Sequence, residues 1–122
     1  MKVASIILAA GQGTRMRSEY PKVLHSLAGR PMVHYSIQAA EEATGSKPVL
    51  VIGHDAERIQ LSVGDVVSYV MQSPQLGTGH AVQQAESILK GQADLIMVTL
   101  ADMPLLSAAT LKRIIDMQAE HN

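Results

Sequence analysis

The chain has 122 residues, enough for one compact domain with its own core but not for two. It contains no cysteine, which excludes disulfides, thiolate catalysis and cysteine-ligated zinc. Its net charge of −1 gives no general attraction to nucleic acid or to an anionic membrane, and its apolar start is too short to span a bilayer. We therefore expect a cytoplasmic protein that binds small molecules and neither nucleic acid nor membrane.

The first predicted element is a buried strand at residues 3–8, a nearly continuous apolar run that ends at a glycine-rich loop. Pro31 suits the first turn of a helix, which we expect to run to about Glu42 and to end at Gly45. The apolar face expected for this helix carries Met32, Tyr35, Ala39 and Ala43.

Strand and helix patterns then alternate to the end of the chain. Strands are expected at residues 48–52, 65–71 and 94–100. Asp55 can cap a short helix at 56–61, Thr78 a helix reaching about Leu89, and Ser107 a last helix. The apolar positions expected in the last two helices are Ala81, Val82, Ala85, Ile88, Leu111, Ile114, Ile115 and Met117, and Met97, Met103 and Met117 are read as core or near-core residues.

This alternation predicts an α/β fold: a Rossmann-like three-layer sandwich with a mainly parallel sheet and helices on both faces, in one domain over residues 1–122. Right-handed crossovers give the strand order 3-2-1-4. Strands one and four then flank the switch point, where ligands of open α/β sheets bind at the carboxyl ends of the strands. The segments that leave these two ends are 9–15 and 101–104.

The glycine-rich loop after the first strand is a candidate phosphate site. Gly11 and Gly13 let backbone N–H groups approach phosphate oxygens, while Arg15 and Lys22 add positive charge. An ordinary strand-to-helix turn with solvated basic residues fits the same two glycines. A dinucleotide fingerprint needs a small residue where Met16 stands, and no Gly-Lys-Ser/Thr triplet of a P-loop follows.

Asp102 follows the fourth predicted strand and lies two residues before Pro104. A carboxylate at that edge, facing phosphates, is a suitable ligand for Mg²⁺, which takes one or two carboxylates plus phosphate and water oxygens. The alternative is a turn aspartate that precedes the last helix.

The loop at residues 72–80 is a candidate base-recognition segment. The Gln72 amide can both donate to and accept from a base edge, and Gly77 lets a planar ring approach the backbone. Thr78 can cap the helix and contact a ligand, and His80 could help to orient the loop. A loop with a helix cap is the simpler alternative.

Three segments together resemble the signature of the sugar-nucleotide pyrophosphorylases: LAAGQGTRM at 8–16, PKVLH at 21–25 and AGRPM at 28–32. A fourth segment, QLGTGHA at 75–81, narrows the resemblance. This segment is similar to the uridyltransferase domain of the bifunctional uridyltransferase/acetyltransferases. The resemblance implies UMP transfer from UTP to N-acetylglucosamine 1-phosphate with Mg²⁺. It also implies nucleotide-binding roles for Leu8, Ala10, Gly11, Gly13, Thr14, Gln72, Gly77 and Thr78, catalytic phosphate contacts for Arg15 and Lys22, and a metal ligand in Asp102.

Two departures from the family pattern accompany the resemblance. Ala101 stands where the family usually has glycine, which leaves a neighbouring subfamily open. The chain also ends before the region that binds the acceptor sugar in the family, so we expect a truncated and weakly active form, with a homo-oligomer possible. The alternatives are a guanylyltransferase of the molybdenum-cofactor type, a cytidylyltransferase or a nucleotide-binding fragment, with a dinucleotide-dependent oxidoreductase the most distant.

Overall fold

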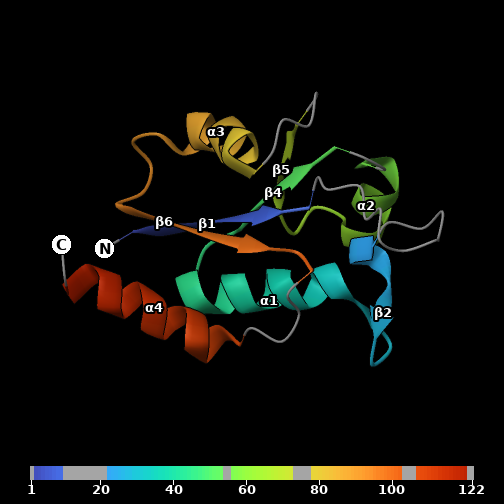
Figure 1. Cartoon of the computed structure of the whole chain (residues 1–122), viewed down its shortest axis with the longest axis horizontal. Helices are drawn as coiled ribbons and strands as arrows, with labels where there is room; N and C mark the ends of the chain where they lie inside the picture. The colour runs from blue at the N-terminus through green and yellow to red at the C-terminus, as the bar shows by residue number, and fades with distance from the viewer. Residues whose placement is uncertain (1, 10–21, 54–55, 73–77, 103–106, 121–122) are drawn as a thin grey trace.

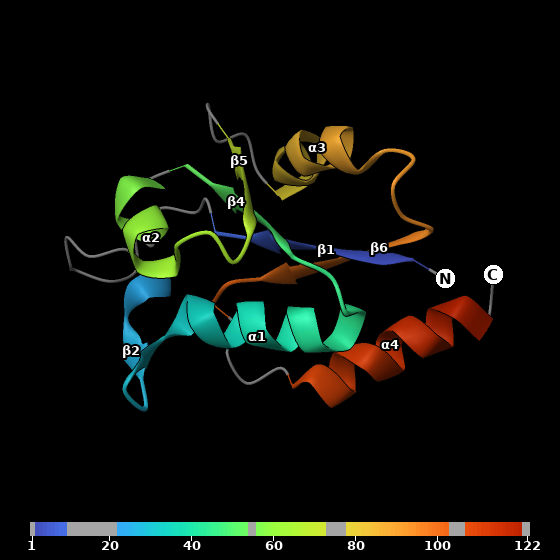
Figure 2. The same ribbon diagram turned by 180° about the vertical axis from the view of Figure 1, so that it is seen from behind.

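A computed structural model describes residues 2–9, 22–53, 56–72, 78–102 and 107–120 (Figure 1). Its main sheet has four parallel strands in the order β5-β4-β1-β6, formed by Ser68–Met71, Val49–Ile52, Val3–Leu8 and Leu95–Leu100. Helices α1 (Met32–Thr44) and α4 (Ala108–Glu120) cover one face and α3 (Thr78–Leu89) the other (Figures 1 and 2). The predicted three-layer sandwich and its strand order 3-2-1-4 are confirmed.

Helix α1 begins at Met32, so Pro31 precedes the helix rather than lying in its first turn, and the helix ends at Gly45 as the sequence predicts. Gly45 adopts the left-handed conformation (φ 72°) and its N–H donates to the Glu41 carbonyl at 2.8 Å, a typical glycine C-cap. The buried face is rotated from the expected one, because α1 packs against both the sheet and α4. Fully or nearly fully buried positions are Val33, Ser36, Ile37, Ala39 and Ala40, whereas Met32, Tyr35 and Ala43 are half-buried.

The last helix, α4, is capped as predicted but is less buried than predicted. The backbone N–H of Thr110 donates to the Ser107 hydroxyl at 3.2 Å. Leu111 and Ile115 are buried, but Ile114 is 54% exposed and Met117 is 57% exposed, so their assignment to the core is wrong. The reason is position: α4 packs mainly along α1 at one side of the sandwich and buries a single stripe.

The other helices start and end close to the predicted positions. Helix α2 spans Ala56–Val63, and Thr78 is the first residue of α3 rather than the residue before it. Ile88 of α3 is exposed although it was expected to be buried, whereas Met97 of β6 is buried as expected. The predicted cap Asp55 and the predicted core residue Met103 lie outside the described residues.

Strand β5 is shorter than predicted and starts at Ser68, because Gly64 (φ 76°) ends α2 in the left-handed conformation and the chain then turns. The Tyr69 hydroxyl donates a hydrogen bond back to the Gly64 carbonyl. Burial raises the pKa of Tyr69 above its usual value of 10.0, and the negative charge of Asp65 adds to the rise.

A small hairpin that the sequence reading did not anticipate precedes α1. It pairs β2 (Ser26–Leu27) with β3 (Arg30–Pro31) in an antiparallel arrangement. Ala28 (φ 53°) and Gly29 (φ 85°) are both left-handed, as the two central residues of a type I′ turn must be. A short turn helix, η1 (Lys22–Leu24), leads into this hairpin.

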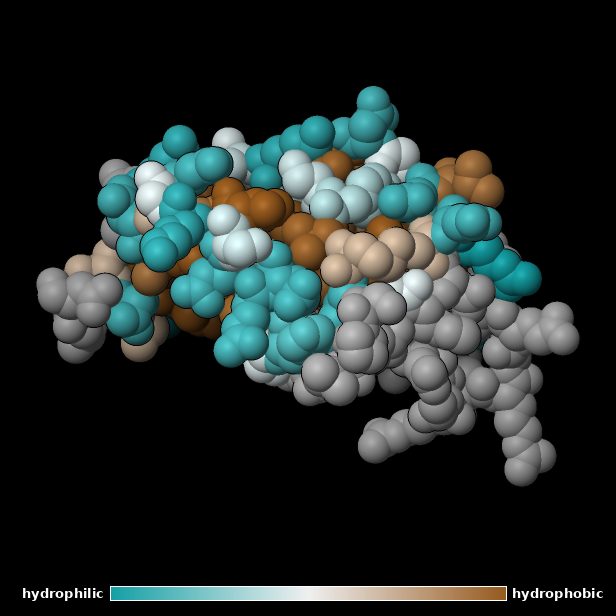
Figure 3. Space-filling model, turned by 90° about the horizontal axis from the view of Figure 1, so that it is seen from above, coloured by the Kyte–Doolittle hydropathy of each residue, from teal (hydrophilic) through white to brown (hydrophobic). Residues whose placement is uncertain are grey.

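The sheet separates two apolar layers. Ile7, Leu50 and Ile52 point towards α1, while Ile6, Val49 and Val51 point towards α3. Strand β6 forms one edge of the described sheet, and its Val98 and Leu100 side chains are partly exposed. From the α3 side, hydrophobic side chains reach the surface between hydrophilic ones (Figure 3). None of the described helices is both long and apolar enough to cross a membrane.

Candidate active site

The carboxyl ends of β1 and β6 lie side by side, as the predicted strand order requires. Leu8 and Leu100 are partners in the parallel register, and the N–H of Ala101 donates to the Leu8 carbonyl at 3.0 Å. Asp102 follows directly and its side chain is exposed. The structure therefore brings Asp102 to the end of β1, the strand after which the glycine-rich loop begins.

Ser36 of α1 holds the turn that carries Asp102, a role that the sequence reading missed. Its buried hydroxyl lies 3.2 Å from the Ala101 carbonyl oxygen and 3.4 Å from that of Leu100, so its proton can be donated to either. Ala101 itself is fully buried. A serine among the apolar positions of α1 was the signal that could have indicated this contact, because a buried hydroxyl needs a partner.

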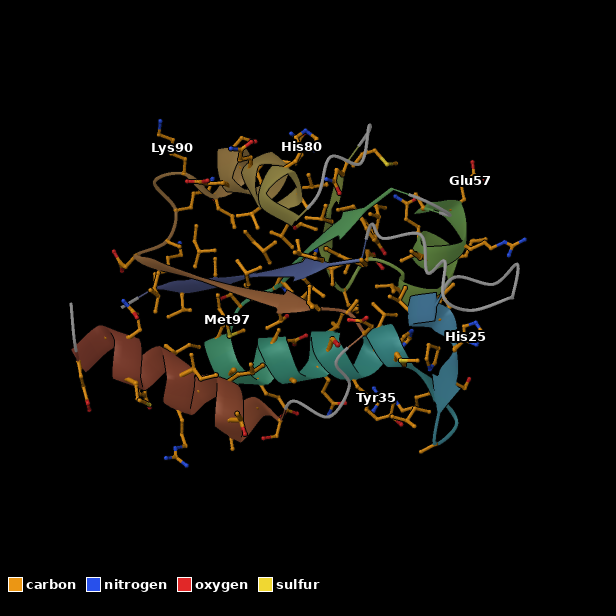
Figure 4. All side chains as sticks on the ribbon, in the orientation of Figure 1. His25, Tyr35, Glu57, His80, Lys90 and Met97 are labelled. Carbon is orange, nitrogen blue, oxygen red and sulfur yellow. The ribbon has the colours of Figure 1, made fainter. Side chains whose placement is uncertain are left out.

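Gln72 extends the end of β5 and is almost fully enclosed, with 3% of its surface exposed. Its backbone N–H donates to the Ile52 carbonyl at 2.8 Å, and its side-chain Nε2 lies 3.0 Å from Nδ1 of His80 on α3. Figure 4 shows His80 on α3, close to the end of β5. Leu8 belongs to the apolar layer on this same α3 side of the sheet.

The predicted site residues are therefore only partly described. Leu8, Gln72 and Asp102 meet the carboxyl edge of the sheet from three different strands, and Thr78 begins the helix above them. Lys22 begins η1, and its side chain is outside the description. Ala10, Gly11, Gly13, Thr14, Arg15 and Gly77 lie outside the described residues.

Asp102 is suited to a divalent cation that takes most of its ligands from elsewhere. Among the described residues, no group of three or more histidine or carboxylate side chains could hold a metal. One exposed carboxylate fits Mg²⁺ or Mn²⁺ bound mainly by phosphate and water oxygens, because these hard cations prefer oxygen and need few protein ligands.

A separate cleft of about 330 Å³ lies between α1 and the end of α2. Arg30, His34 and Glu41 line one side, and Val63 and Val66 the other. No predicted site residue lines it. We place the candidate site at the carboxyl edge because the strand order, the Asp102 turn and the enclosed amide of Gln72 meet there.

Both a family profile and individual known proteins match the amino-acid sequence of the chain. The profile of the MobA-like NTP transferase domain family matches residues 5–122. The bifunctional protein GlmU of Enterococcus faecalis is 46% identical over 112 residues, which cover 92% of this chain and 24% of that protein. GlmU of Caldanaerobacter subterraneus subsp. tengcongensis is 42% identical over 115 residues, covering 94% of this chain and 25% of that protein. The chain thus spans about a quarter of the length of these relatives.

Solved structures share the fold at low sequence identity. Rv0371c from Mycobacterium tuberculosis superposes with a TM-score of 0.85 at 24% identity, covering 98% of this chain and 61% of that one. A manganese complex of Rv0371c superposes with a TM-score of 0.81 at 23% identity, with the same coverage. A UDP-glucose pyrophosphorylase in complex with UDP-glucose gives 0.78 at 23% identity, covering 99% of this chain and 54% of that one.

Proposed function

The chain belongs to the MobA-like NTP transferase domain family, and on this premise we propose that it carries the nucleotide-binding part of an enzyme that transfers UMP from UTP to N-acetylglucosamine 1-phosphate. The observation that carries the proposal is the hydrogen bond between Ala101 and Leu8, which sets Asp102 beside the strand that leads into the glycine-rich loop. Identity of 42–46% to GlmU over nearly the whole chain supports the choice of reaction within the family.

The reaction would be an in-line displacement at the α-phosphorus of UTP. A phosphate oxygen of the sugar 1-phosphate forms the new P–O bond, the bond between the α-phosphorus and its bridging oxygen to the β-phosphate breaks, and pyrophosphate leaves. The attacking oxygen is already anionic, so no side chain needs to remove a proton from it. The work left to the protein is positioning and charge neutralisation, which we assign to the loop amides, Arg15 and Lys22.

Asp102 would hold the divalent cation of the bound nucleotide. When bound, the cation supplies positive charge to the phosphate oxygens as negative charge builds up on them. The exposed carboxylate at the end of β6 supports this assignment, and the manganese complex of Rv0371c supports the use of a divalent metal ion. We propose Mg²⁺ as the ion used, with Mn²⁺ as an alternative occupant of the same position.

Gln72 would read the uracil base, with Gly77 and Thr78 completing this part of the site. An amide offers one donor group and one acceptor, so it can recognise a base edge that presents the complementary pair. Its burial at the end of β5 supports this role, because an enclosed amide discriminates more sharply than a solvated one.

Calorimetric titration of the chain with UTP, CTP, GTP and NAD, with and without Mg²⁺, tests the proposal. We expect UTP to bind most tightly and Mg²⁺ to strengthen that binding. A preference for GTP or CTP would assign the chain to another branch of the family. Binding of UTP without transfer to the sugar phosphate would identify it as a nucleotide-binding fragment.

The metal assignment has a matched control on the same strand. Asp102→Asn should reduce the gain in UTP affinity that Mg²⁺ provides. Asp94→Asn should not, because Asp94 lies before the opposite end of β6, where its carboxylate accepts a hydrogen bond from the Lys2 N–H at 2.8 Å. An unchanged Mg²⁺ response in a folded Asp102→Asn chain contradicts the assignment.

A further inference from the structure

The His80 ring is held between two glutamine side chains. Its Nδ1 lies 3.0 Å from Nε2 of Gln72, and its Nε2 lies 3.2 Å from Nε2 of Gln84. Gln84 is one turn further along α3, so one contact comes from the helix that carries the histidine and the other from the end of the sheet. The result is a chain of three polar side chains from the surface of α3 to an enclosed amide.

The chemistry of imidazole decides how this chain is hydrogen-bonded. A neutral ring has one N–H donor and one acceptor nitrogen, so it cannot accept hydrogen bonds from two amide nitrogens. One glutamine must therefore present its oxygen to the ring. The Gln72 contact with the ring is the shorter of the two, 3.0 Å against 3.2 Å, and Gln72 is almost fully enclosed whereas Gln84 is half-buried on the helix surface, so we assign the turned amide to Gln84. Gln72 then donates to Nδ1, and the ring Nε2–H donates to the Gln84 oxygen.

We propose that His80 is a positioning residue that fixes the Gln72 amide in one orientation and thereby makes the site selective for uracil over cytosine. This inference rests on the proposed function, in which Gln72 reads the base. Uracil presents a donor at N3 and an acceptor at O4, whereas cytosine presents an acceptor at N3 and a donor at N4. An amide held in one orientation matches only one of these patterns, but an amide that can turn by 180° serves both.

The first test measures the ratio of UTP affinity to CTP affinity in the full chain and in three variants. His80→Leu removes both ring contacts and should lower the ratio about tenfold, the effect of one mismatched hydrogen bond in an enclosed site. His80→Asn keeps a polar atom near the position of Nδ1 and should restore most of the preference. His80→Gln is the matched control, because its amide reaches the Nε2 position beside Gln84 and should not restore it.

The pattern of rescue separates positioning from a general effect on stability. A structural role alone would lower both affinities together and follow the melting temperature, leaving the ratio unchanged. Equal ratios in the wild-type and His80→Leu chains, both folded, would overturn the inference while leaving UTP recognition intact. A wild-type chain that binds UTP no better than CTP would instead contradict the proposed function and, with it, the selectivity assigned to His80.

The hydrogen-bond chain can also be tested without a nucleotide or a variant. Two-bond ¹H–¹⁵N correlation spectra of the ¹⁵N-labelled chain distinguish a protonated from an unprotonated ring nitrogen. We expect Nδ1 of His80 to be the unprotonated one. Protonation at Nδ1 would mean that the Gln72 oxygen faces the ring, which contradicts the orientation proposed here.

Discussion

Replacing Ser36 by alanine tests whether the contact between α1 and the Asp102 turn stabilises the protein. The substitution leaves the backbone of α1 unchanged, since alanine is a good helix former. It removes the hydroxyl that lies 3.2 Å from the Ala101 carbonyl oxygen inside the protein. The perturbation is therefore the loss of one donor at a buried carbonyl.

The expected cost follows from the burial of that carbonyl. Leaving a buried acceptor without its donor costs about 1–3 kcal/mol, and removal of the serine hydroxyl from the interior offsets part of this, so we expect about 1–2 kcal/mol. A chain of this length loses about 4 °C in melting temperature for each kcal/mol. Ser36→Ala should therefore melt about 4–8 °C below the wild type.

Ser87→Ala provides the control for this measurement. The Ser87 hydroxyl is exposed and donates to the Gln84 carbonyl within α3 at 3.0 Å, so its removal should change stability by less than about 0.5 kcal/mol. Thermal and urea unfolding followed by circular dichroism measure both variants. Equal, small losses from Ser36→Ala and Ser87→Ala would refute the reasoning.

Three further expectations concern the core, the pH response and the phosphate site. Ile115→Ala should lower the free energy of unfolding by about 2–4 kcal/mol and Ile114→Ala by less than about 1 kcal/mol, because only Ile115 is buried. Urea unfolding measures both variants, and equal losses would contradict the packing of α4. The raised pKa of Tyr69 means that its contribution to stability is complete below about pH 10 and is lost as the pH rises through the folded-state pKa. We expect the free energy of unfolding of the wild type to fall between about pH 8 and pH 11, and that of Tyr69→Phe to lack this fall. Urea unfolding at several pH values measures both. The double variant Arg15→Ala and Lys22→Ala should bind UTP at least about tenfold more weakly at unchanged melting temperature, and unchanged affinity would reject the phosphate contacts.

The sheet could be predicted from the sequence because its signals are local. The strands are short, nearly continuous apolar runs, and glycines or capping residues separate them from the helices. Chirality of the crossovers then limits the strand order to few choices, and the hydrogen bond from Ala101 to Leu8 shows that the expected two strand ends meet. The hairpin before α1 was not predicted from the sequence, because its turn residues are Ala28 and Gly29 rather than the more usual Asn-Gly pair.

Burial of individual side chains was harder to predict because it depends on which elements are neighbours. Periodicity identifies the apolar stripe of α4, but the exposure of Met117 follows from the position of α4 beside α1 at one side of the sandwich. In the same way, Gln72 could be predicted as a site residue because it follows a predicted strand. Its contact with His80 depends on the rotation of α3 about its own axis and on its distance from the end of β5, which the crossover rule does not specify.

The edge position of β6 has a consequence for amide hydrogen exchange. The N–H groups of Leu95 and Ala101 donate to carbonyls of the β1 side, at 3.3 Å and 3.0 Å, and those of residues 97 and 99 share this orientation in a parallel ladder. The N–H groups of residues 96, 98 and 100 point to the other side, where the described sheet ends. Exchange along β6 should therefore alternate between slow and fast with a period of two residues, and any strand that pairs with this edge would slow the fast amides and erase the alternation.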